Sequence, residues 1–339
     1  MSIFDTEPPI INEHLLYKWL NNNYDNLNYK FKESSQLSSE RDYNLKIITE
    51  NNKKYIVKIS NPLEEYNILL LQDSMLNYLS KSIIKNLIPK PVHDKIKKYK
   101  DLKGRNCYVR ILPFIEGDIF ANNQDNKILC QNLAKFLGIL SKSLVNFKHS
   151  AAHREFIWNS SNIEWIKNDI GLFSDQSKID VIKMVINSYN NNIKPMLKKF
   201  RYSVIHGDAN NYNIISSENK ITGLLDYGDS IYAPTVCELT VALAYSLMNS
   251  SNIVEKCCYM VESFQSEFPL NKSELEAISS LIASRLLITV TMAAKQKKKY
   301  PNNDYLSISE NDAWDLLFKL NDINLQELTY NLLKRSSYE

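Results

Sequence analysis

The side chains with the clearest capacity for chemistry lie between residues 202 and 229. An apolar stretch there ends in His206-Gly207-Asp208, and after four further residues Asn213 begins a second apolar stretch. A third apolar stretch ends at Asp226 and is followed by Tyr227-Gly228-Asp229. Three of the seven glycines of the chain fall in this window. Because glycine allows a positive φ or a close backbone approach, the window combines acidic side chains with special backbone positions, or with a set of tight turns.

This spacing predicts the chemistry of phosphoryl transfer. Two strand ends and one loop would bring Asp208, Asn213 and Asp226 into one small volume. Carboxylate and amide oxygens are ligands that Mg²⁺ prefers, together with phosphates and water. A carboxylate that is not a metal ligand can accept the proton of an alcohol. Phosphoryl transfer needs both functions, since a base orients the hydroxyl while metal ions neutralise the phosphate oxygens.

The pattern H-G-D-x-x-x-x-N, followed by a strand that ends in D-Y-G-D, resembles the aminoglycoside phosphotransferase and choline kinase superfamily of protein-kinase-like small-molecule kinases. The resemblance implies that Asp208 is the catalytic base, that Asn213 and Asp226 bind Mg²⁺, and that His206 shapes the catalytic loop. It also implies ATP or GTP as the phosphate donor. The implied fold is α+β and two-lobed, with a small β-rich N-terminal lobe and a larger, mostly helical C-terminal lobe.

The same resemblance implies a set of nucleotide-binding residues in the N-terminal lobe. Lys58 is the only position that fits the strand lysine that holds the α- and β-phosphates. Strand alternation puts Ile56 on the same face, where it could cover the nucleobase. Residues 109–114 resemble the hinge strand, whose backbone would bind the base near Leu112 and Phe114.

Two features depart from the superfamily pattern. The loop expected to cover the phosphates, near residues 37–41, has no glycine, so Ser39 would contact phosphate through its backbone or hydroxyl group. Gln72 stands where the kinase helix usually offers a glutamate to the strand lysine. The usual salt bridge to Lys58 is therefore in question.

A narrower resemblance covers nearly the whole chain. Residues 39–44, 225–229 and 237–239, and residues 305–310 with Trp314, resemble hydroxylysine kinases and the related kinase modules fused to aminotransferases. This resemblance implies that the acceptor is a small hydroxylated amine, most specifically a hydroxy-amino acid such as 5-hydroxylysine. It also implies that GTP is accepted.

Acidic residues near the expected site favour a cationic acceptor. Asp208, Asp229 and Glu238 would make the site negative, which favours an amine. Choline, ethanolamine, aminoglycosides, homoserine and hydroxylysine all meet this condition. Glu238 also follows Thr235 by three residues, so it is equally explained as part of a helix cap or as a brace of the catalytic loop.

Two arginines favour an acceptor that also carries a carboxylate. Arg154 lies just before Trp158, and Arg285 lies in an otherwise apolar helical stretch. A guanidinium binds a carboxylate through two parallel hydrogen bonds, so an arginine facing the substrate would select an amino acid. Alternatively, each arginine pairs with an acidic residue of the protein itself.

Two other classes of function compete with the kinase. A metallohydrolase would usually need more imidazole ligands than this chain offers, because its five histidines are not clustered near the window. His149 and His153 are four residues apart but lack a further zinc ligand. The second alternative is a catalytically inactive nucleotide-binding protein. The chain retains the four residues that the kinase interpretation needs, which argues against this alternative: Lys58, Asp208, Asn213 and Asp226.

These residues must be positioned by two unlike regions, residues 1–115 and 116–339. The first region predicts a helix at 12–20, a hairpin at 43–60, a helix at 63–80, and strands at 92–97 and 106–115 that enclose the basic stretch 95–103. The second region predicts short strands within 202–226 and otherwise helices. These helices are expected at 125–147, 161–168, 176–199, 235–248, 252–265, 273–295 and 310–334.

The composition excludes several classes of protein. With 41 Lys and Arg against 38 Asp and Glu, the formal charge is only +3, so a mainly electrostatic nucleic-acid binder is excluded. A content of 44% hydrophobic residues is enough for a large core. The five cysteines are odd in number and have no C-x-x-C spacing, which indicates neither a disulfide framework nor a zinc site.

The sequence also predicts where the protein works. The N-terminus lacks the basic region and apolar core of a signal peptide, and no stretch approaches the roughly 18 apolar residues that span a membrane. We therefore expect a cytoplasmic protein with a small-molecule substrate and with neither nucleic acid nor membrane as a partner. Its oligomeric state is left open.

Overall fold

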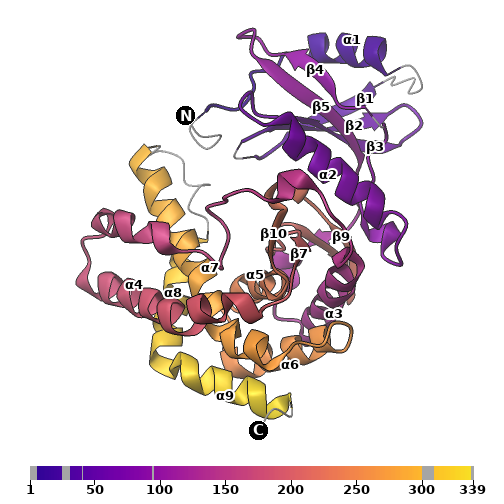
Figure 1. Cartoon of the computed structure of the whole chain (residues 1–339). Helices are drawn as coiled ribbons and strands as arrows, with labels where there is room; N and C mark the ends of the chain where they lie inside the picture. The colour runs from indigo at the N-terminus through magenta and orange to yellow at the C-terminus, as the bar shows by residue number, and fades with distance from the viewer. Residues whose placement is uncertain (1–5, 25–30, 40, 94, 300–308, 337–339) are drawn as a thin grey trace. The chain divides into compact units, whose positions relative to one another are not determined.

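The computed structural model describes residues 6–24, 31–39, 41–93, 95–299 and 309–336. The chain forms two compact units, Met1–Glu116 and Gly117–Glu339 (Figure 1). Glu40 and residues 305, 306 and 308, which contribute to the narrower sequence resemblance, lie outside the described residues.

The first unit is built on an antiparallel sheet of five strands in the order β1-β2-β3-β5-β4. In its described residues, two α-helices and a short 3₁₀ helix accompany the sheet. The elements are α1 (Glu13–Asn23), β1 (Phe31–Leu37), β2 (Tyr43–Thr49), β3 (Lys54–Ile59), α2 (Tyr66–Leu79), a 3₁₀ turn (Lys85–Leu87), β4 (Lys97–Lys100) and β5 (Asn106–Pro113).

The two faces of this sheet have different roles. Alternate residues of the central strands, such as Val57 and Val109, pack with Leu16 and Leu20 of α1 into a buried apolar core. The intervening residues, including Lys58 and its cross-strand partner Arg110, therefore lie on the opposite face. The helix α2 meets that second face through hydrogen bonds to Arg110.

The second unit contains two small antiparallel sheets. One pairs β7 (Tyr202–Ile205) with β10 (Ile231–Pro234), and the other has the order β6-β8-β9. The strands of the latter are β6 (Asp118–Ile119), β8 (Ile214–Ser217) and β9 (Lys220–Leu224). Gly117 precedes β6 with a φ of 139°, and a Cβ there would lie 2.6 Å from the Ser216 carbonyl oxygen. Only glycine fits this close approach.

Helices make up most of the second unit. They are α3 (Lys127–Leu144), α4 (Gln176–Ser188), α5 (Val236–Ser246), α6 (Ile253–Gln265), α7 (Lys272–Lys299), α8 (Glu310–Ile323) and α9 (Leu325–Arg335). Shorter helical turns lie at Phe120–Asn123, Ser150–Ala152, Glu164–Leu172, Tyr189–Ile193, Lys194–Lys199 and Tyr227–Asp229. The helix α7 contacts α4, α5, α8 and α9 and forms the centre of the unit.

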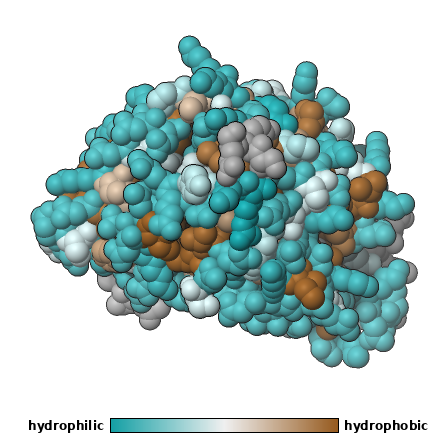
Figure 2. Space-filling model, turned by 90° about the horizontal axis from the view of Figure 1, so that it is seen from below, coloured by the Kyte–Doolittle hydropathy of each residue, from teal (hydrophilic) through white to brown (hydrophobic). Residues whose placement is uncertain are grey.

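The length and composition of α7 correct one sequence expectation. Its most apolar 18-residue window has a mean hydropathy of 1.7, which is enough to cross a membrane, so the expectation that no stretch approaches this limit was wrong. However, 94% of that window is buried inside the protein. The helix is apolar because it fills a core. The face of the molecule shown in Figure 2 is mostly hydrophilic, with limited hydrophobic patches.

Most of the expected elements are present, with local differences that have physical causes. The stretch predicted as one helix over 176–199 changes from α to π to 3₁₀ geometry, and Pro195 near its end lacks the N–H that α geometry would use. The helix predicted over 310–334 is divided at Asn324, which has a φ of 66°. The turn between β8 and β9 needs only residues 218 and 219. The strands β1, β6 and β10 were not predicted.

Candidate active site

The strand β7 leads directly into the predicted catalytic loop. His206 follows the strand and is fully buried, and its Nε2 lies 2.9 Å from the carbonyl oxygen of Leu225. Gly207 has a φ of 79°, and a Cβ there would lie 2.9 Å from the backbone oxygen of Asp229. Glycine is therefore required for the turn that presents Asp208.

The carboxylate of Asp208 accepts hydrogen bonds on both oxygens. Oδ1 accepts from Nη2 of Arg285 at 2.7 Å. Oδ2 accepts from the side-chain amides of Asn210 at 3.0 Å and Asn213 at 2.8 Å. Asn213 also donates to the carbonyl oxygen of Asp208 at 2.9 Å. The carboxylate is therefore held in one orientation while 18% of the side chain stays exposed.

The surroundings of Asp208 make its proton affinity unusually high. Burial is the main cause of a raised pKa, and the negative charge of Asp229 adds to it. Arg285 and the hydrogen bond from Asn210 act in the opposite direction. Asp226 raises the pKa further, so both Asp226 and Asp229 act electrostatically on Asp208.

The predicted metal-binding residues lie at one end of the β8–β9 hairpin. Ile214 pairs with Leu224, and the Leu225 N–H donates to the Asn213 carbonyl, so Asn213 and Asp226 follow the same end of the ladder. Asp226 has a left-handed backbone with a φ of 57°, and its side chain is exposed. Its Oδ1 accepts a long hydrogen bond from the Gly228 N–H.

These two residues fit a hard cation. Both hydrogen bonds donated by the Asn213 amide go to Asp208, which leaves the amide oxygen as the atom that a cation would take. The described residues include no group of three His, Cys, Asp or Glu side chains suited to a metal ion. Magnesium does not require such a group, because it is often held by one or two protein oxygens together with phosphates and water.

Glu238 supports the catalytic loop through a hydrogen bond from the loop backbone. It is fully buried in the first turn of α5, and its Oε2 accepts from the backbone N–H of His206 at 2.6 Å. Thr235 makes no side-chain cap bond to this helix. The observed contact is thus the loop brace, one of the two explanations that the sequence left open. Glu238 was also predicted to bind substrate, but the structure buries its side chain against the loop backbone.

Burial shifts the pKa of the two groups in this brace in opposite directions. It raises the pKa of Glu238 to about 7, against hydrogen bonds from the backbone of His206 and Gly207. It lowers the pKa of His206 to about 4. His206 is therefore neutral at physiological pH, as suits a loop-shaping residue more than a proton carrier.

The two predicted substrate-binding arginines already bind protein atoms. Arg285 forms an ion pair with Asp208 and donates to the Trp158 carbonyl at 3.0 Å. Arg154 donates to the carbonyls of Gly228 and Ser230 at 2.7 and 3.2 Å, and so holds the backbone that follows Asp226. Trp158 lies beside Arg285, with its ring centre 4.7 Å from the guanidinium carbon.

The predicted nucleotide-binding residues lie on the sheet of the first unit. Ile56 pairs with Leu112 and Lys58 pairs with Arg110, so all four share one sheet face. Gln72, which replaces the usual glutamate, accepts from Arg110 at 2.6 Å, and Asp73 accepts from the same guanidinium at 3.0 Å. Arg110 is therefore the partner of this part of α2.

Two further predicted nucleotide-binding residues lie near the ends of strands. The hydroxyl of Ser39 accepts from the Asp42 N–H at 3.2 Å and so stabilises the turn before β2. The Phe114 N–H donates to the Lys54 carbonyl at 3.1 Å, which extends the β3–β5 pairing by one residue. The Phe114 ring lies 4.2 Å from Nζ of Lys46.

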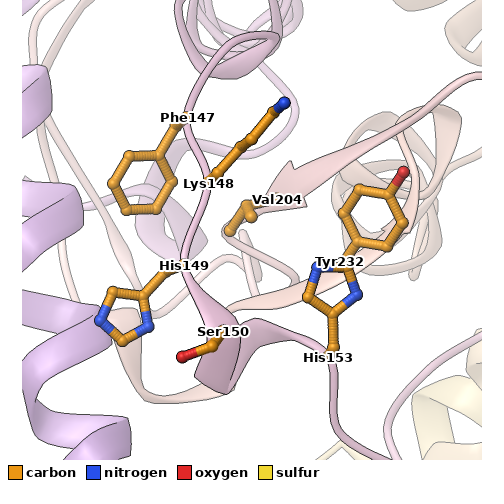
Figure 3. Close-up of a pocket in the computed structure, with 7 residues that line it drawn as sticks. All are labelled: Phe147, Lys148, His149, Ser150, His153, Val204 and Tyr232. Carbon is orange, nitrogen blue, oxygen red and sulfur yellow. The ribbon is translucent and has the colours of Figure 1, made fainter.

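A separate pocket of about 400 Å³ lies on the second unit and involves none of these residues. Figure 3 shows Val204 between Phe147 and Tyr232. The rings of His153 and Tyr232 lie in tilted contact with centres 4.4 Å apart, and Nδ1 of His149 accepts from a backbone N–H. No carboxylate lines the pocket, so it lacks the carboxylate ligands that magnesium prefers.

Comparison with known proteins identifies the family. The phosphotransferase enzyme family matches residues 33–254 of the chain. The chain belongs to this family. A hydroxylysine kinase from Mus musculus is 28% identical over 252 residues, which span 69% of this chain and 66%, just under two thirds, of that protein. A hydroxylysine kinase from Danio rerio is 23% identical over 309 residues, which span 86% of this chain and 87% of that protein.

Solved structures confirm the fold. An amicoumacin kinase in complex with AMP-PNP and Ca²⁺ has a TM-score of 0.67 at 15% identity, covering 91% of this chain and 94% of that one. A microcompartment-associated aminopropanol kinase has a TM-score of 0.66 at 11% identity, covering 92% and 99%. The expected two-lobed, protein-kinase-like α+β fold is thus confirmed. The chain is thus a member of the phosphotransferase enzyme family that has this fold.

Asn210 is a site residue that the sequence did not indicate. Its amide donates to Oδ2 of Asp208, and its own oxygen accepts from the backbone N–H groups of Tyr212 and Asn213. The only available signal was its place two residues after Asp208, within the loop. Tyr245 was also missed, although its hydroxyl lies 3.4 Å from Nη2 of Arg285.

Proposed function

We propose that this kinase uses Mg²⁺ to transfer the γ-phosphate of ATP or GTP to the hydroxyl of a small amine-bearing acceptor, specifically a hydroxy-amino acid such as 5-hydroxylysine. The observation that carries the proposal is the carboxylate of Asp208, which is fixed on both oxygens, partly exposed and raised in pKa. These are the properties of a general base.

The charge around Asp208 supports an acceptor with an amine. Asp226 and Asp229 both act electrostatically on Asp208, so the loop ends carry three acidic groups. Asp229 is buried, whereas Asp226 is exposed. With a magnesium ion at Asp226 and Asp208 paired with Arg285, the charge of Asp229 would remain to attract a cation.

An amino acid as acceptor is supported by the relatives. Hydroxylysine kinases from four vertebrates are 23 to 28% identical to this chain. The two arginines do not add to this support, because Arg285 is paired with Asp208 and Arg154 holds a backbone segment. The residue that would bind an acceptor carboxylate is therefore not assigned. Trp158 and Asp229 are the remaining proposed acceptor-binding residues.

In the proposed reaction, Asp208 accepts the proton of the acceptor hydroxyl as its oxygen attacks the γ-phosphorus. The bond from that phosphorus to the nucleoside diphosphate breaks, and the diphosphate leaves. His206 and Glu238 hold the loop backbone that presents Asp208. Asn213 and Asp226 would bind magnesium, which supplies positive charge to the phosphate oxygens when bound.

The nucleotide is proposed to bind the first unit. Lys58 would bind the α- and β-phosphates, and Ser39 would contact phosphate through its backbone N–H. Ile56 would cover the base, while Leu112 and Phe114 would bind its edge through backbone groups. Hydrogen bonds of this kind discriminate weakly between bases, which is compatible with the use of GTP as well as ATP.

An acceptor panel tests this proposal. The purified protein is given ATP or GTP with 5-hydroxylysine, homoserine, choline, ethanolamine or an aminoglycoside, and release of nucleoside diphosphate is followed. We expect the highest kcat/KM with 5-hydroxylysine. Turnover confined to acceptors without a carboxylate would contradict the amino-acid proposal.

A further inference from the structure

Arg285 is the largest side chain that is fully buried in the described parts of the chain. It lies in the middle of α7, where its neighbours along the helix are apolar or small, and only 1% of it is exposed. Burying a guanidinium is costly unless it is paired and hydrogen-bonded. Its contacts should therefore show why the fold keeps a cation there.

Every hydrogen bond of this guanidinium is directed towards Asp208 or the structure around it. Nη2 donates to Oδ1 of Asp208 at 2.7 Å and lies 3.4 Å from the Tyr245 hydroxyl. Nη1 donates to the Trp158 carbonyl at 3.0 Å. The rings of Trp158 and Tyr245 lie 4.7 and 5.5 Å from the guanidinium carbon. The cation is thus itself fixed from several directions.

The hydrogen bonds to Asp208 leave its two oxygens unequal. A carboxylate offers about two acceptor positions on each oxygen. Oδ2 accepts from Asn210 and from Asn213, so both of its positions are occupied. Among the described residues, Arg285 alone donates to Oδ1. The position that remains for an incoming hydroxyl is therefore on Oδ1, beside the bond from Arg285.

We propose that Arg285 is the positioning residue of the base, and that it holds Asp208 so that Oδ1 is the oxygen that takes the acceptor's proton. This inference rests on the proposed function. The acceptor O–H bond breaks, its proton passes to Oδ1, and the acceptor oxygen bonds to the γ-phosphorus as the nucleoside diphosphate leaves. Arg285 keeps its hydrogen bond to Oδ1 throughout.

This role explains why the residue is arginine. A planar guanidinium can donate in fixed directions to Asp208 and to the Trp158 carbonyl while it stacks on two rings, whereas the ammonium of lysine is a single point on a flexible chain. The burial of Arg285 also separates this role from the binding of an acceptor carboxylate, which would need an accessible edge of the guanidinium.

Kinetics of Arg285→Lys and Arg285→Ala test the proposal, with the acceptor that the parent uses best. A displaced base should reduce kcat about 100-fold in both variants, while the KM for the nucleotide stays within about threefold of the parent. Millimolar guanidinium ion should restore at least part of the kcat of Arg285→Ala and should not affect Arg285→Lys. A side chain needed only for folding would not give this rescue.

Arg201→Lys is the matched control. Arg201 also forms an ion pair with a fully buried acid of the same unit, Glu274, but it touches none of the proposed site residues in the described structure. Its kcat should equal that of the parent, even if its melting temperature falls. An Arg285→Lys enzyme with parental kcat, or an Arg285→Ala enzyme that binds nucleotide normally and is not rescued, would overturn the proposal.

A crystal structure of Arg285→Lys provides a readout that does not depend on the acceptor. We expect the Asp208 carboxylate to occupy more than one orientation, or to turn away from the bonds that it accepts from Asn210 and Asn213. A single orientation identical to that of the parent would overturn the positioning role. If the parent phosphorylates no member of the acceptor panel, the proposed function fails, but this structural comparison still decides whether Arg285 positions Asp208.

Discussion

At the scale of single residues, Asp208 is the centre of the account. Its replacement by asparagine keeps the shape of the side chain but removes the negative charge, and with it the ability to take a proton and the ion pair with Arg285. We expect Asp208→Asn to lower kcat by about 10² or more, since general-base assistance typically contributes this much. Nucleotide affinity, measured by titration, should change little. Loss of nucleotide binding with an unchanged chemical step would remove Asp208 from this role.

The effect of replacing Asp226 should depend on the concentration of magnesium. Its exposed carboxylate is proposed as a metal ligand, so Asp226→Asn should weaken the binding of the magnesium-nucleotide complex. We expect its activity to rise with Mg²⁺ well beyond the concentration that saturates the parent. Chelation of divalent ions should abolish activity in both proteins. A defect that is independent of Mg²⁺ would contradict the assignment.

Glu238 predicts a dependence of stability on pH. Its pKa is about 7 when folded and 4.5 ordinarily, so between these values the folded protein keeps a proton that the unfolded chain loses. The contribution of Glu238 to the free energy of unfolding therefore falls as pH rises from 4.5 to 7, by about 3 kcal/mol. The amide of Glu238→Gln does not titrate, so the free energy of unfolding of this variant does not contain this decrease with pH.

Urea unfolding of both proteins between pH 4.5 and 7.5 measures this effect. The stability of Glu238→Gln relative to the parent should increase with pH up to about pH 7 and then become constant. His206 shifts in the opposite direction, but it is present in both proteins and cancels in the difference. A constant difference across this range would show that Glu238 is ionised in the folded protein at low pH.

The sequence predicted the residues proposed to take part in the reaction better than the residues that hold them in position. Asp208, Asn213 and Asp226 could be assigned roles because a spaced motif contains them. Asn210 and Tyr245 act through side-chain hydrogen bonds that no spacing reveals. For Arg285, the sequence showed that an apolar helix must pair it, but the partner lies 77 residues away in the chain. Only tertiary structure could identify it.

At the scale of elements, Gly138 sets the distance between α3 and α6. A Cβ at Gly138 would lie 2.6 Å from the Phe264 carbonyl oxygen, which is helix backbone and cannot move aside. Gly138→Ala should therefore destabilise the protein by about 1 to 3 kcal/mol. Gly171→Ala is the control, because a Cβ there meets nothing within 4 Å. Thermal melts that show equal stability for the two variants would contradict this account of the helix packing.

Elements with a clear apolar period were predicted well, and those without one were missed. The helix α3 and the β2–β3 hairpin have buried faces that repeat with the period of their structure. The strand β1 lies at a sheet edge, and its described side chains are mostly exposed and polar, so it shows no alternation. The strand β10 has four residues and ends in proline, and only its pairing with β7 makes it a strand.

At the scale of the whole molecule, the fold class followed from the order of a β-rich region and a helical region, and the family followed from one motif. The choice of acceptor did not follow from either. The acidic groups around Asp208 are compatible with many amines, and both arginines that suggested a carboxylate bind protein atoms instead. Specificity within this family therefore has to be measured on the protein.

The most direct test is identification of the product formed from 5-hydroxylysine. The parent and Asp208→Asn are incubated with 5-hydroxylysine, Mg²⁺ and either GTP or ATP, and the products are examined by mass spectrometry and phosphorus NMR. If Asp208 is the general base, the parent forms one phosphate ester at the hydroxyl oxygen, and Asp208→Asn forms it at least about 100-fold more slowly. A parent enzyme that leaves 5-hydroxylysine unmodified, or that attaches phosphate to an amine nitrogen, would contradict it.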